Sequence, residues 1–427
     1  MSNANRVFIT GLSALTACGE TADSTWDALL AGQSGIGEIS QWDLSTWVHR
    51  LGGELKNFQP AKMLPDRKLM KVISRQDAMG INAAMQAINH SQLLPYRETL
   101  AATESFNDQT AVYVGSPGNK YFQQYDFLPL LAKTGSDMQQ FATQLFNEVH
   151  PMWLLRILPN NVLAYTGISY GFKGPNHNIT NHAVSGTQAI LEAYHAIRQG
   201  QAERAVVVGY DIGIEPQALF YYEKLGVMSA NHLKPFDKEH DGTVLAEGAA
   251  ALILESEASV QARSATCYGE IVGGLSASEA SGLFSIEAEG NHLAELMSNT
   301  LETYQINSSE VGLLVAHGNG NSKSDDSEAI AIQRVFGDNP NPVPVTAFKW
   351  AMGHTLCASG VLDTVLTTYA LRNDCVPGIA NFNQAASVCE PLNISAHHRP
   401  LQGNKKAVML NRGFASMNAC LVIKACD

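Results

Sequence analysis

The chain has 427 residues, of which 45% are apolar and 16% are charged, a composition that excludes a disordered chain and indicates a folded globular protein. Its formal net charge of −12 disfavours nucleic acid as a partner. No apolar run reaches the about 18 residues that span a bilayer, and the first residues lack the pattern of a signal peptide. We therefore expect a cytoplasmic protein that makes no contact with a membrane.

Short apolar runs along the chain predict strands, several of them buried on both faces of a sheet. These runs are 7–10, 111–115, 205–209, 249–254, 312–316, 343–346, 407–410 and 420–424. Helix patterns lie between them at 24–31, 73–88, 186–198, 292–304, 326–335 and 356–371, with Ser24 and Asp326 as expected N-caps. Strands that alternate with helices predict α/β layers around mostly parallel or mixed sheets.

The two halves of the chain resemble each other where a small-residue loop with a histidine runs into a helix, at 182–197 and 354–371. We infer an internal duplication, with an N-terminal half at 1–258 and a C-terminal half at 259–427. An aromatic-rich segment at about 119–160 interrupts the alternation. Such side chains need a surface to pack against, so we expect a capping subdomain or an oligomer contact there.

The seven cysteines are scattered and have no CxxC spacing. This pattern argues against a zinc site and a disulfide framework, so we expect buried, reduced thiols and no metal. A local basic run stands out in this acidic protein, and it is either a solvated helix face or a surface for an acidic partner. It consists of Lys62, Arg67, Lys68, Lys71 and Arg75.

Two histidines stand at the ends of predicted strands, where α/β proteins assemble their sites. His317 precedes a Gly-rich loop and Glu328, while Lys349 lies five residues before His354. Either histidine alone is typical of a structural or surface residue. Together, two imidazoles and a Lys–Glu pair suit acyl transfer or decarboxylation, because neutral imidazoles can donate hydrogen bonds to a thioester or enolate oxygen.

These motifs resemble those of the β-ketoacyl-acyl-carrier-protein synthases, elongating condensing enzymes of the thiolase superfamily. The segment KPFDKEHDGTVLAEGAAALILE is similar to their RPFD…DGFVxGEGA…LE signature, HGNGN to HGTGT, KWAMGHTLCASG to KSxxGHxxxAxG, and GFASMN to GFGGTN. The resemblance covers nearly the whole chain. It implies a five-layered α-β-α-β-α fold built from two duplicated halves, with the site at their interface.

The resemblance also implies partners. An acyl carrier protein would dock at the basic run and deliver its phosphopantetheine arm, so no resident cofactor is expected. A dimer would form by extension of the central sheets, either with a second copy or with a related ketosynthase or chain-length-factor subunit. Asn319 and Asn321 stand where two threonines contact phosphopantetheine in the family.

Roles for the catalytic positions follow in the same way. His317 and His354 would hold the malonyl thioester carbonyl and assist decarboxylation, with Lys349 and Glu328 as a supporting charged pair. Phe414 would be the gating phenylalanine. Its backbone N–H would join that of residue 183 in an oxyanion hole.

The resemblance places Ala183 at the nucleophilic cysteine, because HAVSG corresponds to A-C-x-S-G before a helix. A methyl group cannot attack a thioester, so the chain as written should form no acyl-enzyme. We expect the neighbouring His182 to make local hydrogen bonds. Cys357 is expected to be a packing residue and not a displaced nucleophile.

Three interpretations of Ala183 remain open. In the first, the chain is a ketosynthase of fatty acid or polyketide biosynthesis whose decarboxylative Claisen condensation is abolished, and the intact histidines favour this. In the second, it is a non-catalytic chain-length-factor-like subunit that pairs with an active ketosynthase and shapes its product tunnel. Ala415 and Ser416 favour this, since they replace glycines and stiffen the gating loop. In the third, it decarboxylates malonyl thioesters without condensing them.

Overall fold

A ten-stranded mixed sheet dominates the computed structural model, which describes residues 6–64, 66–118, 120 and 124–426. Its strand order is β10-β9-β13-β14-β8-β1-β7-β6-β4-β5. Each strand predicted from an apolar run is present. The strands are β1 (Val7–Leu15), β4 (Thr110–Gly115), β5 (Asn176–Ile179), β6 (Arg204–Ile212), β7 (Glu247–Ser256), β8 (Gly269–Ser278), β9 (Leu313–Val315), β10 (Val345–Thr346), β13 (Lys406–Gly413) and β14 (Met417–Lys424).

The large sheet consists of two five-stranded halves with one pairing pattern. Along β1-β7-β6-β4-β5 the successive pairs are antiparallel, antiparallel, parallel and parallel. The order β8-β14-β13-β9-β10 repeats these four relations. The halves join where β1 pairs with β8 over Val7–Ile9. The position between residues 258 and 259 falls inside α12 (Glu257–Arg263), which connects β7 to β8.

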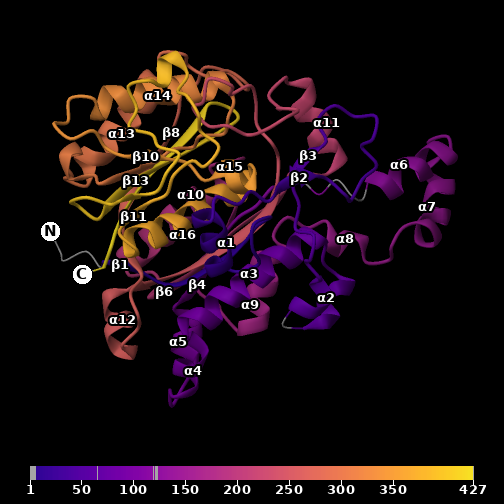
Figure 1. Cartoon of the computed structure of the whole chain (residues 1–427). Coiled ribbons are helices and arrows are strands. Elements are labelled where there is room, and N and C mark those ends of the chain that lie inside the picture. The colour runs from indigo at the N-terminus through magenta and orange to yellow at the C-terminus, as the bar shows by residue number, and fades with distance from the viewer. Residues whose placement is uncertain (1–5, 65, 119, 121–123, 427) are drawn as a thin grey trace.

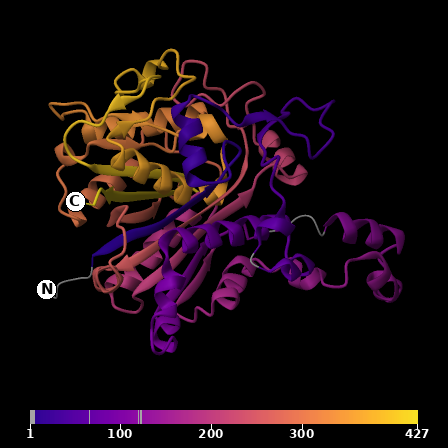
Figure 2. The ribbon, with the colours of Figure 1, turned by 60° about the horizontal axis from the view of Figure 1, so that its bottom comes forward.

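Three layers of helices alternate with the two halves of the sheet (Figure 1). The middle layer is α10 (Ser185–Arg198) and α16 (Ser359–Arg372), and the outer layers are α3 (Arg75–Ser91) with α9 (Asn161–Tyr170) and α13 (Asn291–Thr303) with α14 (Ser322–Phe336). The expected α-β-α-β-α arrangement is therefore confirmed, and Figure 2 shows the layers from another side. No helix in the described ranges combines the length and apolarity needed to cross a membrane.

In the middle layer, every residue of α16 except Tyr369 and Arg372 is buried, which constrains the polar residues of this helix. In α16 the hydroxyls of Thr364, Thr367 and Thr368 donate to the backbone carbonyls four residues earlier, at 2.6–2.8 Å. These bonds satisfy each hydroxyl inside its own helix, so the threonines can be buried without other partners. The helix then runs through the core and positions the loop before it, which contains His354.

Some local predictions differ from the structure. Thr21 and not Ser24 caps α1 (Ala22–Leu30), because Ser24 is the N3 residue of a capping box. Asn321 caps α14, which begins at Ser322, ahead of the expected cap Asp326. The sequence patterns also missed two strands of the large sheet. β8 contains adjacent glycines, and β5 is a short polar edge strand.

The expectation of reduced thiols is wrong for Cys267 and Cys426, which form a disulfide. They are 159 positions apart in sequence, but they flank one antiparallel pair, in which Glu270 of β8 lies opposite Lys424 of β14. Cysteine spacing could not reveal this, because the pairing of β8 with β14 brings the two residues together. The free cysteines are Cys18, Cys357, Cys375, Cys389 and Cys420.

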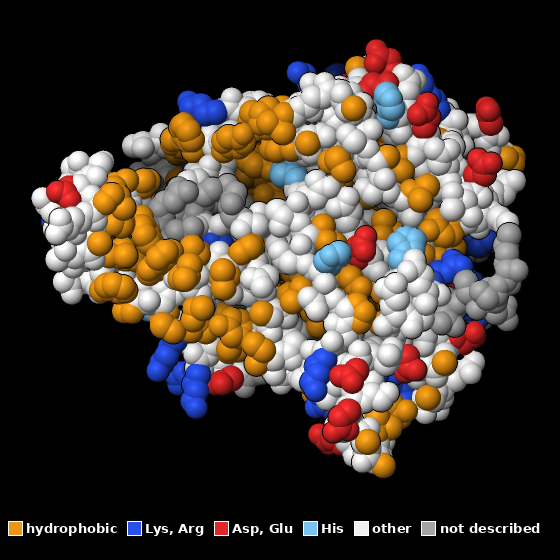
Figure 3. All heavy atoms as spheres, turned by 180° about the vertical axis from the view of Figure 1, so that it is seen from behind, with side chains coloured by type: hydrophobic (Ala, Val, Ile, Leu, Met, Phe, Trp, Pro, Cys, Tyr) orange, Lys and Arg blue, Asp and Glu red, His pale blue; other side chains and the backbone are white. Residues whose placement is uncertain are grey.

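The interrupting segment projects from the body of the molecule as three helices, here called the arm (Figures 1 and 2). The arm consists of α6 (Gln124–Lys133), α7 (Met138–Glu148) and α8 (Trp153–Arg156); positions 119 and 121–123 lie outside the described residues. Apolar side chains gather on its face in Figure 3. Within the arm, Leu128 and Phe146 are 59% and 70% exposed. An apolar face of this kind is typical of a surface that a partner covers.

Candidate active site

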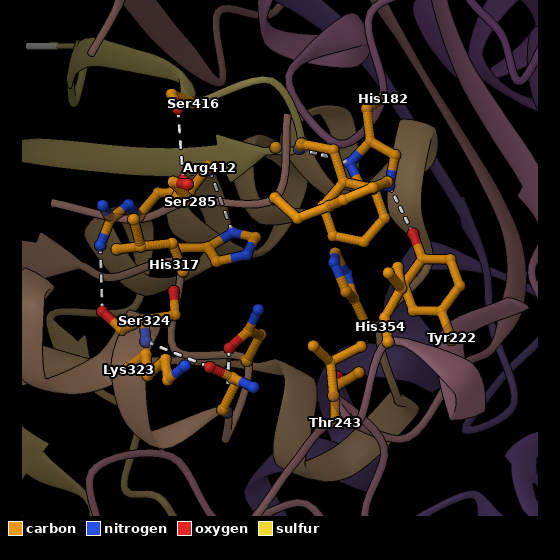
Figure 4. Close-up of a pocket in the computed structure, with 18 of the residues that line it drawn as sticks. His182, Tyr222, Thr243, Ser285, His317, Lys323, Ser324, His354, Arg412 and Ser416 are labelled. Carbon is orange, nitrogen blue, oxygen red and sulfur yellow. Dashed lines mark hydrogen bonds between the residues drawn. The ribbon is translucent and has the colours of Figure 1, made fainter. Parts of the chain in front are cut away.

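A pocket of about 220 Å³ contains both histidines predicted to be catalytic (Figure 4). In the C-terminal half its walls come from the loops after β9 and β13, the loop 279–286 after β8 and the segment around His354. In the N-terminal half they come from His182, Tyr222 and the segments 225–227 and 241–243. The rings of His317 and His354 meet edge to face, with centroids 5.1 Å apart and planes at 82°. Two residues from separate sequence motifs are therefore neighbours in one pocket between the two halves.

His317 is held through its backbone and its ring. Its N–H and that of Gly318 donate to the two carboxylate oxygens of Glu328, at 2.7 and 3.0 Å. The Arg412 N–H donates to Nδ1 of His317 at 3.3 Å. Because a backbone N–H can only donate, Nδ1 carries no proton, and the ring proton is on Nε2.

His354 is fixed between a neighbouring loop and α16. Its N–H donates to the Val244 carbonyl at 2.7 Å, and its own carbonyl accepts from the Ala246 N–H at 3.0 Å. Nδ1 lies 3.3 Å from the Ser359 hydroxyl. When that hydroxyl donates, the proton of His354 is on Nε2 as well. The pair can then offer two Nε2–H donors to one ligand oxygen.

Both imidazoles are neutral at neutral pH. Burial is the main cause that lowers the pKa of His317 and of His354 well below the ordinary 6.5, and the positive charge of Lys349 lowers both further. Neutral imidazoles donate hydrogen bonds without carrying a charge into the pocket. Donors placed in this way stabilise an oxygen on which negative charge develops, such as that of an enolate.

The predicted pairing of Lys349 with Glu328 is wrong. Lys349 Nζ lies 3.2 Å from Oδ2 of Asp363 in α16, and both side chains are almost fully buried. Glu328 instead accepts the backbone N–H groups at the start of the loop after β9, and burial raises its pKa to about 7. Sequence spacing could not show whether Glu328 or Asp363 pairs with Lys349, because both carboxylates lie on helices that begin near the pocket.

Removal of the Asp363 carboxylate is expected to destabilise the protein strongly. Asp363→Ala leaves the Lys349 ammonium buried without its counter-charge, which should lower the free energy of unfolding by about 3–5 kcal/mol. The exposed pair of Lys133 with Glu148 provides a matched control, and Glu148→Ala should cost less than about 1 kcal/mol. Urea unfolding of both variants measures the difference, and equal losses would contradict a structural role for the buried pair.

Ala183 is fully buried directly before α10, whose N-cap is Val184. A Cβ built on Gly413 would come 3.3 Å from the Ala183 nitrogen, so the end of β13 lies against this residue. The neighbouring His182 lines the same pocket as His317 and His354. The structure thus brings the small-residue turn before α10 to the two histidines.

The predicted oxyanion-hole donor at Phe414 is already occupied. Its N–H donates to Nδ1 of His182 at 3.2 Å, and Nε2 of His182 is hydrogen-bonded to the Tyr222 hydroxyl. The His182 and Phe414 rings are stacked, with centroids 4.2 Å apart. Burial lowers the pKa of His182 to about 4, so this ring is also neutral. The expectation of local hydrogen bonds for His182 agrees with these contacts.

Both predicted pantetheine residues line the pocket. The side-chain oxygen of Asn319 accepts the Asn321 N–H at 3.0 Å, and that of Asn321 accepts the Ser324 N–H at 3.3 Å. The two carbonyl oxygens therefore hold the turn and the start of α14. Each side-chain NH₂ group remains as the donor that these residues can offer to a ligand.

The basic run divides into four exposed residues and one residue with a buried partner. Arg75 is the latter: its side chain is 31% exposed, but its guanidinium pairs at 2.8 Å with Glu247, a fully buried carboxylate. This pair gives Arg75 a structural role, and its predicted part in docking stays a prediction. The exposed members lie on α2 (Pro60–Met63) and the 3₁₀ turn η1 (Arg67–Lys71), and they are Lys62, Arg67, Lys68 and Lys71.

Sequence reasoning missed an ion pair in the pocket wall. The Arg412 guanidinium lies 2.7 Å from the Glu279 carboxylate, with side chains only 6% and 2% exposed. Asn418 bonds both partners and completes the network. One signal was available, since an arginine follows the apolar run 407–410 and directly precedes the turn glycine of GFASMN.

The layered fold and the paired histidines define a thiolase-like protein. Among solved structures, the ishigamide ketosynthase/chain length factor has a TM-score of 0.88 and 21% identity, covering 99% of this chain and 100% of that one. A beta-ketoacyl synthase from Burkholderia phymatum has a TM-score of 0.86 and 24% identity, with 99% and 100% covered. At these identities the likeness establishes the fold.

The chain belongs to the beta-ketoacyl synthase family. It matches the beta-ketoacyl synthase N-terminal domain over residues 4–259 and the C-terminal domain over residues 268–383. Similar relatives are named 3-oxoacyl-[acyl-carrier-protein] synthase 2. The one from Synechocystis sp. is 29% identical over 98% of both chains, and the one from Staphylococcus aureus is 28% identical over 99% of both. The resemblance inferred from the motifs is thereby confirmed.

Proposed function

We propose that this chain is a ketosynthase-type protein of fatty acid or polyketide biosynthesis in which Ala183 occupies the nucleophile position. It would bind malonyl-carrier-protein and decarboxylate it, but would not form an acyl-enzyme or condense acyl chains. The observation that carries the proposal is the neutral pair His317 and His354, which can direct two N–H donors at one oxygen. The names of the relatives support a carrier-protein thioester as the substrate class.

Decarboxylation needs no thiol. The bond between the malonyl carboxylate carbon and C2 breaks, CO₂ leaves, and the electron pair passes to the thioester oxygen as an enolate. The two imidazoles would donate to that oxygen, and the nearby Lys349 ammonium would add positive potential. Protonation of C2 by water then gives the acetyl thioester. The two imidazoles line the pocket, and the proton comes from water.

The rest of the pocket suits a substrate delivered on a carrier protein. The NH₂ groups of Asn319 and Asn321 could donate to the carbonyl groups of a pantetheine arm. The exposed cations on α2 and η1 could attract an acidic carrier protein. We keep this docking surface as part of the proposal.

Incubation with malonyl-carrier-protein tests the proposal. We expect acetyl-carrier-protein to accumulate while the intact mass of the chain stays unchanged, both measured by mass spectrometry. Malonyl-carrier-protein without the chain gives the background rate. A rate no higher than this background would contradict the proposal.

A second candidate function is a non-catalytic subunit that pairs with an active ketosynthase. It is favoured by the gating loop, where Ala415 and Ser416 have φ values of 60° and 56°, a conformation that disfavours both residue types. The exposed apolar face of the arm also suits a subunit contact. If the chain alters product length only when an active ketosynthase is added, and releases no CO₂ alone, this candidate replaces the first.

A further inference from the structure

His182 lies where three aromatic rings meet at the pocket wall. It stacks on Phe414, and the Tyr222 ring lies 5.2 Å from Phe414 and 6.1 Å from His182 between centroids. His182 also has a φ of 51°, in the left-handed region. Figure 4 shows its ring bonded to Tyr222 at the pocket edge. The residue is held from both sides in one orientation.

The bond from the Phe414 N–H to His182 Nδ1 has a chemical consequence. An imidazole nitrogen and a thioester carbonyl oxygen are both acceptors, so they compete for the same backbone donor. Gly413 places this peptide against the Ala183 nitrogen, where an acyl carbonyl would have to lie. While His182 holds the N–H, a carbonyl cannot use it.

The loop that carries this donor is held in place by other bonds. The Ala415 N–H donates to the Leu283 carbonyl at 2.7 Å, and the Ser416 carbonyl accepts from the Glu279 N–H at 2.8 Å. The Ser416 hydroxyl donates to the Gly282 carbonyl at 2.8 Å. The loop is therefore attached to the segment 279–283, and a carbonyl could gain the Phe414 N–H most directly by displacing the His182 ring.

We propose that His182 is a specificity-determining residue. By accepting the Phe414 N–H, it prevents the carbonyl of an acyl thioester from using that donor. The donors of His317 and His354 remain available to a malonyl group. This inference rests on the proposed function. The chain would thus exclude acyl thioesters in two ways, through the absent nucleophile and through an occupied donor. The second barrier would persist after a nucleophile is restored.

The test uses a background in which a nucleophile is present, Ala183→Cys. Acyl-enzyme formation from octanoyl-pantetheine is followed by quenched mass spectrometry, with its kcat and KM determined separately. Since one oxyanion-hole donor is worth about 10²–10³ in kcat, adding His182→Ala should raise acylation at least about 10-fold, mainly in kcat. His195→Ala, an exposed site on the same helix α10, is the matched control and should change nothing.

A conservative variant distinguishes the effect of losing the hydrogen bond from the effect of losing the packing of the imidazole ring. In His182→Asn, the side-chain oxygen takes the position of Nδ1, and asparagine tolerates a left-handed φ. This variant should therefore keep acylation as slow as in Ala183→Cys alone. Tyr222→Phe, which frees the other end of the ring, should give a smaller increase and serves as a second variant if His182→Ala does not fold.

In the Ala183→Cys background, equal acylation rates with histidine and with alanine at position 182 would overturn the inference, and so would the absence of acylation in both. Faster acylation with asparagine at position 182 would also overturn it. None of these results would affect the proposed function, which depends on malonyl decarboxylation by the native chain. Conversely, absence of decarboxylation would refute the proposed function while the acylation rates still report on His182.

Discussion

Ala183→Cys is expected to give the chain an acyl-enzyme that the native protein cannot form. A thiol at this position would stand at the N-terminus of α10, where the helix dipole favours the thiolate. Incubation with acyl-carrier-protein should then add the acyl mass to the variant, slowly while His182 still occupies the Phe414 N–H, and leave the native chain unmodified. With malonyl-carrier-protein present as well, the variant should release a β-ketoacyl product.

The native chain contains its own control for this experiment. Cys357 lies close to the same helix, with its sulfur 3.6 Å from the Ser185 hydroxyl oxygen. Burial raises its pKa well above the ordinary 9.0, so it stays a thiol and should not be acylated. Acylation of the native chain, or an Ala183→Cys variant that folds but never gains acyl mass even with His182 removed, would refute the assignment of Ala183.

Loss of either pocket histidine is the second large effect we expect. Each of the two Nε2–H donors would stabilise the enolate oxygen, so His317→Ala or His354→Ala should slow malonyl decarboxylation by about 10²–10³-fold. The double variant should lose less than the product of the single losses, because the two donors act on one oxygen. Release of CO₂ from malonyl-carrier-protein measures all three rates.

Two comparisons sharpen this prediction. Replacement by asparagine keeps an N–H donor, so His354→Asn should retain more activity than His354→Ala. His177, exposed on β5, provides a His→Ala control that should have the native rate. A single alanine variant at the pocket that decarboxylates at the native rate would exclude its histidine from the mechanism.

Much of the fold was predictable because it depends on local patterns. The continuous apolar runs of β6 and β7 correspond to strands buried on both faces, and the pattern before α10 repeats before α16. The histidines were predictable too, since each follows a strand in a motif of several residues. Order along the chain, together with the strand-end rule, was enough to bring His317 and His354 to one pocket.

The errors at the site concern side-chain pairing, which tertiary packing decides. Lys349 pairs with Asp363 and not with Glu328, and Arg75 is paired with the buried Glu247. Both depend on which of several carboxylates the packing places nearest. The bond between His182 and the Phe414 N–H joins residues 232 positions apart. No local pattern carries such information.

Electron density for malonyl-pantetheine, with its thioester sulfur replaced by an amide nitrogen, would test the central claim most directly. The account predicts the carbonyl oxygen within hydrogen-bond distance of both Nε2 atoms, at His317 and His354, with the Ala183 methyl group beside the ligand. A ligand carbonyl bound away from both imidazoles, in crystals where the pocket is accessible, would contradict it.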